Sequence, residues 1–120
     1  MEHELLKSLA AKDCKAEEML QGTFMGNEAF YVRMLGKLPS NTCLVRMRSA
    51  LEAGDAAALF DVAHELKGVY AALGLTPLWQ QCSEIVEIAR AGSLDGVPDR
   101  MVSLEQGHYE YVNIIEKGKT

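Results

Sequence analysis

Apolar residues recur every three or four positions along most of the chain. This spacing gathers apolar side chains on one side of an α-helix, where they can pack against a neighbouring helix. No segment of useful length alternates between apolar and polar residues, as a β-strand with one buried face would. The pattern therefore predicts an all-α protein.

Glycine, proline and helix-capping residues divide this pattern into separate helices. Asn27 and Asp55 are expected to cap helices at their starts, and Thr76 precedes a proline that suits a first helical position. Pro39 interrupts the second helix, and Gly74 is expected to end a long one. The predicted helices cover about residues 2–20, 28–38, 42–53, 56–73, 77–91 and 98–117.

The loops that follow Ala53 and Leu73 are very short, and short loops force neighbouring helices to lie antiparallel. The expected fold is therefore an antiparallel up-down four-helix bundle with an additional short N-terminal helix. A chain of 120 residues has the size of one domain. Residues 1–120 are accordingly expected to form a single helical-bundle domain.

The helix expected over residues 56–73 carries an apolar stripe on one side and His64 on the other. Because each residue advances about 100° around the axis, His64 lies about 140–180° from every member of the stripe. Its side chain is therefore expected to face solvent. The stripe consists of Leu59, Val62, Leu66, Val69 and Leu73.

The residues around His64 on this outer side are small or apolar for a solvent-exposed helix face. A glycine inside a helix costs about 1 kcal/mol relative to alanine, and close approach of another molecule to Gly68 would compensate that cost. Lys67 follows His64 by three residues, so its ammonium can reach a phosphoryl group on the imidazole. The expected docking surface for the other molecule consists of Ala57, Phe60, Asp61 and Ala71.

A solvent-facing imidazole is a nucleophile, because its ordinary pKa of about 6.5 leaves it largely neutral at the pH of a cell. It can therefore take a phosphoryl group and pass it on. A single exposed histidine is usually an ordinary surface residue, but His64 together with Lys67 and Gly68 favours a reactive site. No acid–base partner accompanies His64, so a partner molecule is expected to supply most of the catalysis.

The remaining histidines and cysteines point to structural roles. His3 lies near the start of the chain, and His108 falls on the apolar stripe of the last helix, where one hydrogen bond would satisfy it. The three histidines lack the spacing of metal ligands, so no metal is expected. Cys82 lies in line with apolar neighbours and is expected to be a buried thiol.

Charge and cysteine content narrow the choice of partners and location. The net charge of -5 opposes binding to the phosphates of a nucleic acid. Three cysteines without paired spacing argue against a disulfide framework and fit a reducing compartment. The sequence shows neither a signal peptide nor a membrane span. We therefore expect a cytoplasmic monomer that contacts neither nucleic acid nor a membrane.

The residues that surround His64 resemble the histidine-containing phosphotransfer (HPt) domains of two-component phosphorelays. The resemblance implies a four-helix bundle in which His64 accepts the phosphoryl group, Lys67 assists the phosphate and Gly68 clears room. Positions that are often small or polar in the family carry Val69, Tyr70 and Ala72 here, which we expect to influence partner preference. The resemblance rests on Ala63-His64-Glu65-Leu66-Lys67-Gly68, then Leu73-Gly74, then Leu78 and Cys82.

The resemblance also implies what the domain exchanges phosphate with. We expect a phosphocarrier without an ATP site or a cofactor of its own, which serves aspartate-containing receiver domains of response regulators, a hybrid sensor histidine kinase, or both. The Mg²⁺ is expected on the receiver. Two alternatives stay open: the phosphate-accepting domain of a chemotaxis-type or hybrid histidine kinase, and a module that docks on a receiver without being phosphorylated.

Overall fold

The computed structural model describes residue 18, residue 22 and residues 27–118, and within these residues the chain forms helices and no strand. The expected all-α class is confirmed. The helix expected over residues 2–20 lies outside the described residues, apart from Glu18. The elements are α3 (Glu28–Leu35), the 3₁₀-helix η1 (Leu38–Ser40), α4 (Cys43–Glu52), α5 (Ala56–Leu73), α6 (Thr76–Arg90) and α7 (Val97–Gly118).

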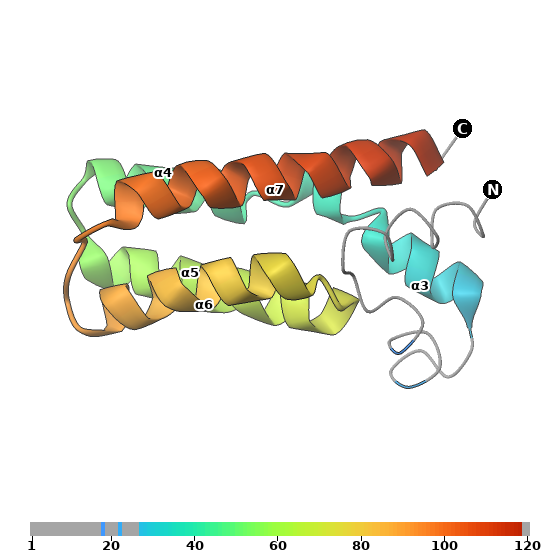
Figure 1. The fold of residues 1–120 in the computed structure, drawn as a ribbon, viewed down its shortest axis with the longest axis horizontal. Coiled ribbons are helices and arrows are strands. Elements are labelled where there is room, and N and C mark those ends of the chain that lie inside the picture. Colours follow the sequence, from blue (N-terminus) through green and yellow to red (C-terminus); the bar gives the residue numbers. More distant parts are fainter. Residues whose placement is uncertain (1–17, 19–21, 23–26, 119–120) are drawn as a thin grey trace.

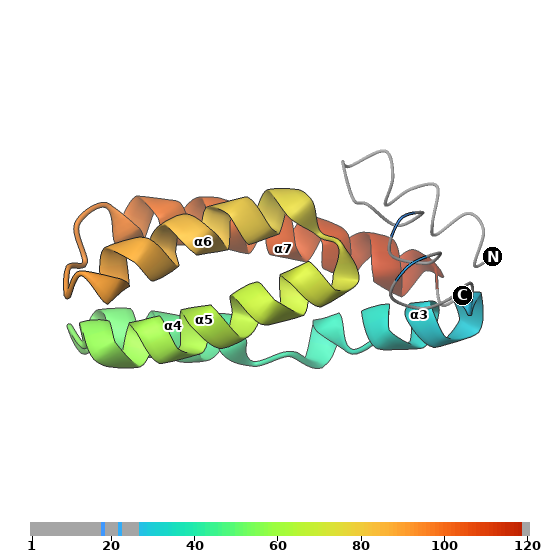
Figure 2. The ribbon, with the colours of Figure 1, turned by 90° about the horizontal axis from the view of Figure 1, so that it is seen from below.

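Helices α4 to α7 form the expected antiparallel bundle (Figure 1). The connections 53–55 and 91–96 lie at one end of the bundle, and the connection 74–75 lies at the other. Helices α5 and α6 lie side by side in two perpendicular views and pack on each other most extensively (Figure 2). Helix α3 lies beyond the end that holds the connection 74–75.

Helix α5, which carries His64, begins and ends where the sequence predicts. The Asp55 carboxylate accepts a hydrogen bond of 3.0 Å from the backbone N–H of Ala58, one of the amides that a helix start leaves unpaired. At the other end Gly74 adopts φ 73°, and the N–H of Leu75 donates to the Tyr70 carbonyl at 3.0 Å. The short connection to α6 follows from this glycine-dependent turn.

The apolar stripe of α5 is rotated relative to the prediction. Val62 and Val69 are only half-buried, whereas Ala63 and Tyr70 are buried in their place. The small side chain of Ala63 lets α6 approach closely, and the Cys82 thiol donates to the Ala63 carbonyl oxygen at 3.3 Å. The buried residues of α5 are Leu59, Ala63, Leu66, Tyr70 and Leu73.

Two predicted helix boundaries are wrong. The helix expected over residues 28–38 ends at Leu35, because Gly36 caps it, and η1 with Pro39 follows as a separate turn. Thr76 was expected to cap α6 but is its first helical residue, and Leu75 is the N-cap without a side-chain bond. The Thr76 hydroxyl instead donates to the Gly74 carbonyl oxygen at 3.5 Å, because the helix already begins at Thr76 and the capping position falls on Leu75.

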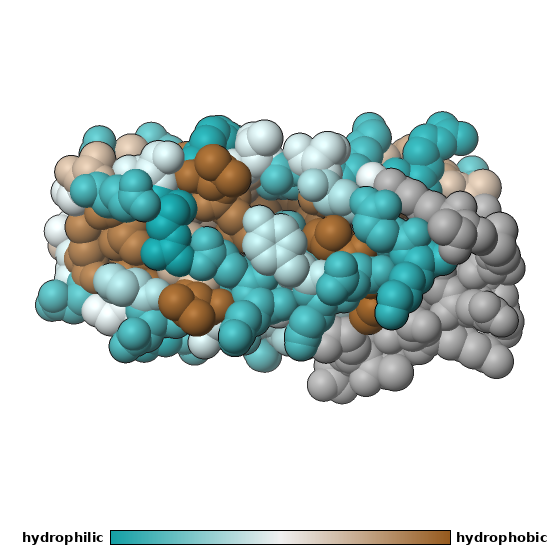
Figure 3. All heavy atoms as spheres, turned by 90° about the horizontal axis from the view of Figure 1, so that it is seen from above, coloured by the Kyte–Doolittle hydropathy of each residue, from teal (hydrophilic) through white to brown (hydrophobic). Residues whose placement is uncertain are grey.

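Ion pairs join most of the neighbouring helices of the bundle. Arg46 of α4 pairs with Glu65 of α5 at 2.6 Å. Arg48 of α4 pairs with Glu105 of α7, and Arg100 of α7 pairs with Glu84 of α6. On the face of α4 and α7, hydrophilic residues are interspersed with separate apolar patches (Figure 3). No helix in the described part of the chain has the length and apolar character to cross a membrane.

Candidate functional site

His64 lies in the middle of α5 and is exposed, as its position opposite the stripe predicts. Its ring stacks on the ring of Phe60 one turn earlier, with 5.7 Å between centroids and 29° between planes. Phe60 is half-buried and packs against the core, so it provides a fixed surface for one side of the imidazole. The other side stays open to solvent.

Phe60, the ring that stacks on His64, also contacts a guanidinium from α6. The Arg90 side chain lies over the Phe60 ring, 5.0 Å from its centroid, and also pairs with Glu87 at 3.2 Å. Aromatic rings attract cations placed over their faces. A positive charge therefore lies on the N-terminal side of His64.

A second cation lies on the C-terminal side. The Lys67 ammonium lies 5.4 Å from the centroid of the Trp79 ring, which belongs to α6. Helices α5 and α6 are thus bridged by two cation–aromatic contacts, one on each side of His64, whereas ion pairs bridge other neighbouring helices. Lys67 follows His64 by three residues on the same helix, and Arg90 lies over the ring that stacks on His64, so both positive charges suit a site that receives a negatively charged group.

Gly68 leaves bare surface beside His64. A Cβ atom added at Gly68 would meet nothing within 4 Å, so packing within the chain does not require glycine there. Gly107 differs, because a Cβ atom there would lie 2.8 Å from Cδ2 of the buried Leu78. No contact within the described fold therefore accounts for the helix-weakening glycine at position 68.

Most of the predicted docking residues come together. Ala57, Phe60 and Asp61 line a surface depression of about 300 Å³, together with Ala89, Arg90 and Gly92 from the end of α6. Ala71 is exposed but lies outside this depression, two turns beyond His64. Of the positions where this chain departs from the family, Tyr70 is buried and so cannot contact a partner in this fold.

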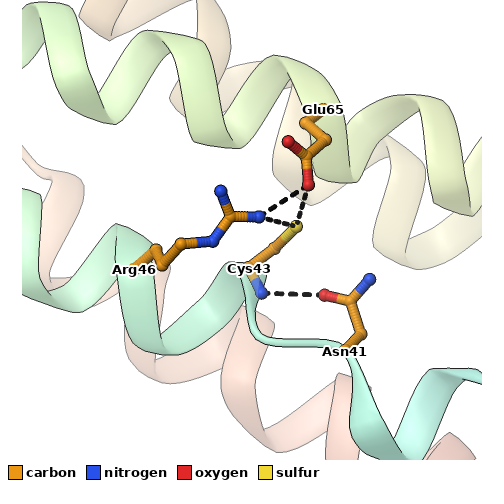
Figure 4. Close-up of polar contacts among 4 residues, drawn as sticks. All are labelled: Asn41, Cys43, Arg46 and Glu65. Atoms are coloured by element: carbon orange, nitrogen blue, oxygen red, sulfur yellow. Dashed lines mark hydrogen bonds and ion pairs between the residues drawn. The ribbon is translucent and has the colours of Figure 1, made fainter.

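Glu65, next to His64, ties α5 to α4 (Figure 4). Its carboxylate accepts a hydrogen bond of 3.1 Å from the Cys43 thiol and one of 2.6 Å from Arg46. These two contacts lower the pKa of the Glu65 carboxyl. Burial, and then the Glu65 carboxylate, raise the pKa of the Cys43 thiol to about 11, so this cysteine stays protonated. The cluster has a structural role.

The other predicted structural residues have the expected surroundings. His108 is 2% exposed, and its Nδ1 shares a hydrogen bond of 2.7 Å with the Tyr70 hydroxyl. Burial lowers the pKa of His108 to about 4, so its ring is neutral. Cys82 is buried, and burial raises the pKa of its thiol to about 12. In the described part of the chain, no three His, Cys, Asp or Glu residues are placed to hold a metal ion.

Sequence reasoning missed Trp79 and Arg90 as neighbours of the site. Both lie on α6. Only the rotation of α6 against α5 brings Trp79 to Lys67 and Arg90 to Phe60. The available signal was the exposed edge of the amphipathic α6, where an aromatic residue is out of place. Trp79 is 36% exposed.

The structure is a helical bundle with an exposed histidine, open space beside it and a cation on either side. These features are typical of a domain that carries a chemical group on an exposed side chain. The Hpt domain family matches residues 40–113. The structure is similar to that of histidine-containing phosphotransfer protein B (HptB) from Pseudomonas aeruginosa PAO1, with a TM-score of 0.73 and 26% identity over 88% of this chain and 92% of that chain. No curated protein matches the chain.

Because the family match spans more than half of the chain, this protein belongs to the Hpt domain family, the histidine phosphotransfer domains of two-component phosphorelays. The resemblance noted around His64 is thereby confirmed.

Proposed function

We propose that His64 carries a phosphoryl group between aspartate residues of receiver domains. The observation that supports this assignment is the exposed imidazole with open space at Gly68 and a cation on either side. His108 does not fit the role, because it is buried and hydrogen-bonded. An exposed, unenclosed site suits a nucleophile that meets its reactant on the surface of another protein.

The transfer forms one bond and breaks one. A nitrogen of the His64 ring attacks the phosphorus of an aspartyl phosphate on the receiver, the P–O bond to the aspartate breaks, and the carboxylate leaves. The reverse reaction on a second receiver returns the phosphoryl group to an aspartate. The receiver contributes Mg²⁺ and a lysine of its own, so the domain needs no nucleotide site. Lys67 stabilises the phosphoryl oxygens from the side of the carrier.

The direct experiment mixes the domain with a receiver that carries a labelled phosphoryl group. The wild-type domain should acquire label that is lost in acid and kept in base, as phosphohistidine behaves. His64→Gln should acquire none while keeping its helical content, because an exposed side chain contributes little to stability. His3→Gln is the matched control and should label like the wild type.

Three outcomes would contradict the assignment. Label on the His64→Gln variant, at His3 or His108, would move the acceptor elsewhere. Stable binding of wild type to a phosphorylated receiver, with no label transferred to the domain, would favour a docking module. Label that arrives only from ATP through a kinase domain, and never from a receiver, would instead favour the phosphate-accepting domain of a histidine kinase.

A further inference from the structure

The contact between Lys67 and Trp79 has a consequence for how the phosphoryl group is received. The Lys67 ammonium lies over the Trp79 ring, 5.4 Å from its centroid. Lys67 is three residues after His64, so the same side chain can turn toward a group on the imidazole. Lys67 therefore has two alternative positions for its charge.

The two positions differ in strength. Trp79 is 36% exposed, and a cation over a partly exposed ring is held weakly. A charge-assisted hydrogen bond to a phosphoryl oxygen is stronger. The ring therefore retains the ammonium only until a phosphoryl group offers a better partner.

We propose that Trp79 is a positioning residue that holds the Lys67 ammonium beside His64 in the unphosphorylated domain and releases it to the phosphoryl group. This proposal rests on the proposed role of His64. Held on the ring, the long lysine side chain samples fewer conformations and keeps its charge near the acceptor before the phosphoryl group arrives. Phosphorylation of His64 then uncovers the indole of Trp79.

The release is measurable because Trp79 is the single tryptophan of the chain. Phosphoramidate supplies the phosphoryl group without a receiver: a His64 ring nitrogen attacks phosphorus, the P–N bond breaks and ammonia leaves. Tryptophan emission and acid-labile phosphate are followed in the same sample. Emission should change in step with phosphohistidine in the wild type and in Lys37→Gln, which removes the same charge at an exposed lysine elsewhere in the chain. Lys67→Gln should gain phosphohistidine, more slowly, with little change in emission.

The outcomes separate this proposal from the proposed function. Wild type that gains no phosphohistidine, either from phosphoramidate or from a labelled receiver, would overturn both. Phosphohistidine without a change in emission would overturn only the release of Lys67. An equal change in emission in Lys67→Gln would overturn it as well, because the phosphoryl group would then act on the indole without the lysine.

Rates test the positioning role itself. Trp79→Leu should slow phosphoryl uptake by about two- to fivefold, because the lysine side chain then has to be ordered when the phosphoryl group arrives, and Trp79→Phe should restore part of the rate. In a Lys67→Gln background, Trp79→Leu should have no further effect. Equal slowing in both backgrounds would show that Trp79 acts only through packing and would overturn the proposal.

Discussion

At the scale of single residues, the site leaves the imidazole of His64 open and fixes its neighbours. Phe60 stacks on one side of the ring, and Glu65 is held by Cys43 and Arg46 on α4. Neither contact covers the imidazole, which stays exposed. In the proposed function, the domain contributes to catalysis through the few groups that can touch an incoming phosphoryl group, and Lys67 is the clearest candidate among them.

Removal of the Lys67 charge should slow transfer without unfolding the domain. Lys67→Ala should reduce the rate of phosphoryl transfer from a receiver about tenfold to a hundredfold, since a charge-assisted hydrogen bond contributes about 1.5–3 kcal/mol. The free energy of unfolding should change by less than about 1 kcal/mol, because only an exposed cation–aromatic contact is lost. Lys67→Arg should restore only part of the rate, because a planar guanidinium differs in reach. Equal rates in all three proteins, in a time course at matched concentrations, would remove Lys67 from the site.

At the scale of elements, α5 combines a buried side that packs in the bundle with an exposed side on which we propose that a partner docks. Its start, its end and the exposure of His64 follow from the sequence, because caps and helical periodicity are local properties. The buried stripe of α5 is predicted less accurately from the sequence. Tyr70 is buried because its hydroxyl meets His108, which lies 38 residues later on α7, and no local pattern contains that contact.

Gly68 is expected to lower the stability of α5 and to leave room for a receiver beside His64. Gly68→Gln should raise the free energy of unfolding by about 0.5–1 kcal/mol, because glycine is the poorer helix former and open space surrounds the position. The longer side chain should obstruct a receiver and slow transfer about tenfold or more. Gly68→Ala should stabilise the helix similarly and slow transfer less.

Gly107→Ala is the matched control for the stability effect. It should bring no comparable gain, because the new Cβ atom would lie 2.8 Å from Leu78 Cδ2 and force a buried side chain to move. Chemical denaturation of the variants gives the free energies of unfolding. Wild-type transfer rates in Gly68→Gln would show that partners do not approach this side of α5.

At the scale of the whole molecule, the bundle and the exposure of His64 were predictable, whereas the pairing of side chains between helices was not. Short loops fixed the antiparallel order of the helices, and one helix alone fixed the outward direction of His64. The contacts of Trp79 with Lys67 and of Arg90 with Phe60 depend on how α6 is rotated against α5. That rotation results from packing across the whole core, which a periodic pattern specifies only coarsely.

The buried His108 should make the whole fold sensitive to mild acid. Its pKa is lowered to about 4 in the folded protein, from 6.5 for an ordinary histidine. Between these pH values the unfolded chain binds a proton that the folded protein does not, so stability falls as the pH falls from 6.5 to 4. The total loss should be about 3 kcal/mol, since each tenfold difference in proton affinity is worth about 1.4 kcal/mol.

Denaturation curves between pH 4.5 and pH 7 measure this effect. His108→Gln keeps an amide beside the Tyr70 hydroxyl but cannot titrate, so its stability should depend much less on pH over this range. Parallel losses in the two proteins would assign the acid sensitivity to other groups.

The most direct test of the central claim follows one labelled phosphoryl group through the domain. Wild-type protein labelled by a first receiver is purified, its label is mapped to a residue at neutral pH, and a second, unlabelled receiver is then added. The account predicts that the label maps to His64 and then moves to an aspartate of the second receiver, as the base-sensitive acyl phosphate. Label mapped to another residue, or released as inorganic phosphate without reaching the second receiver, would contradict it.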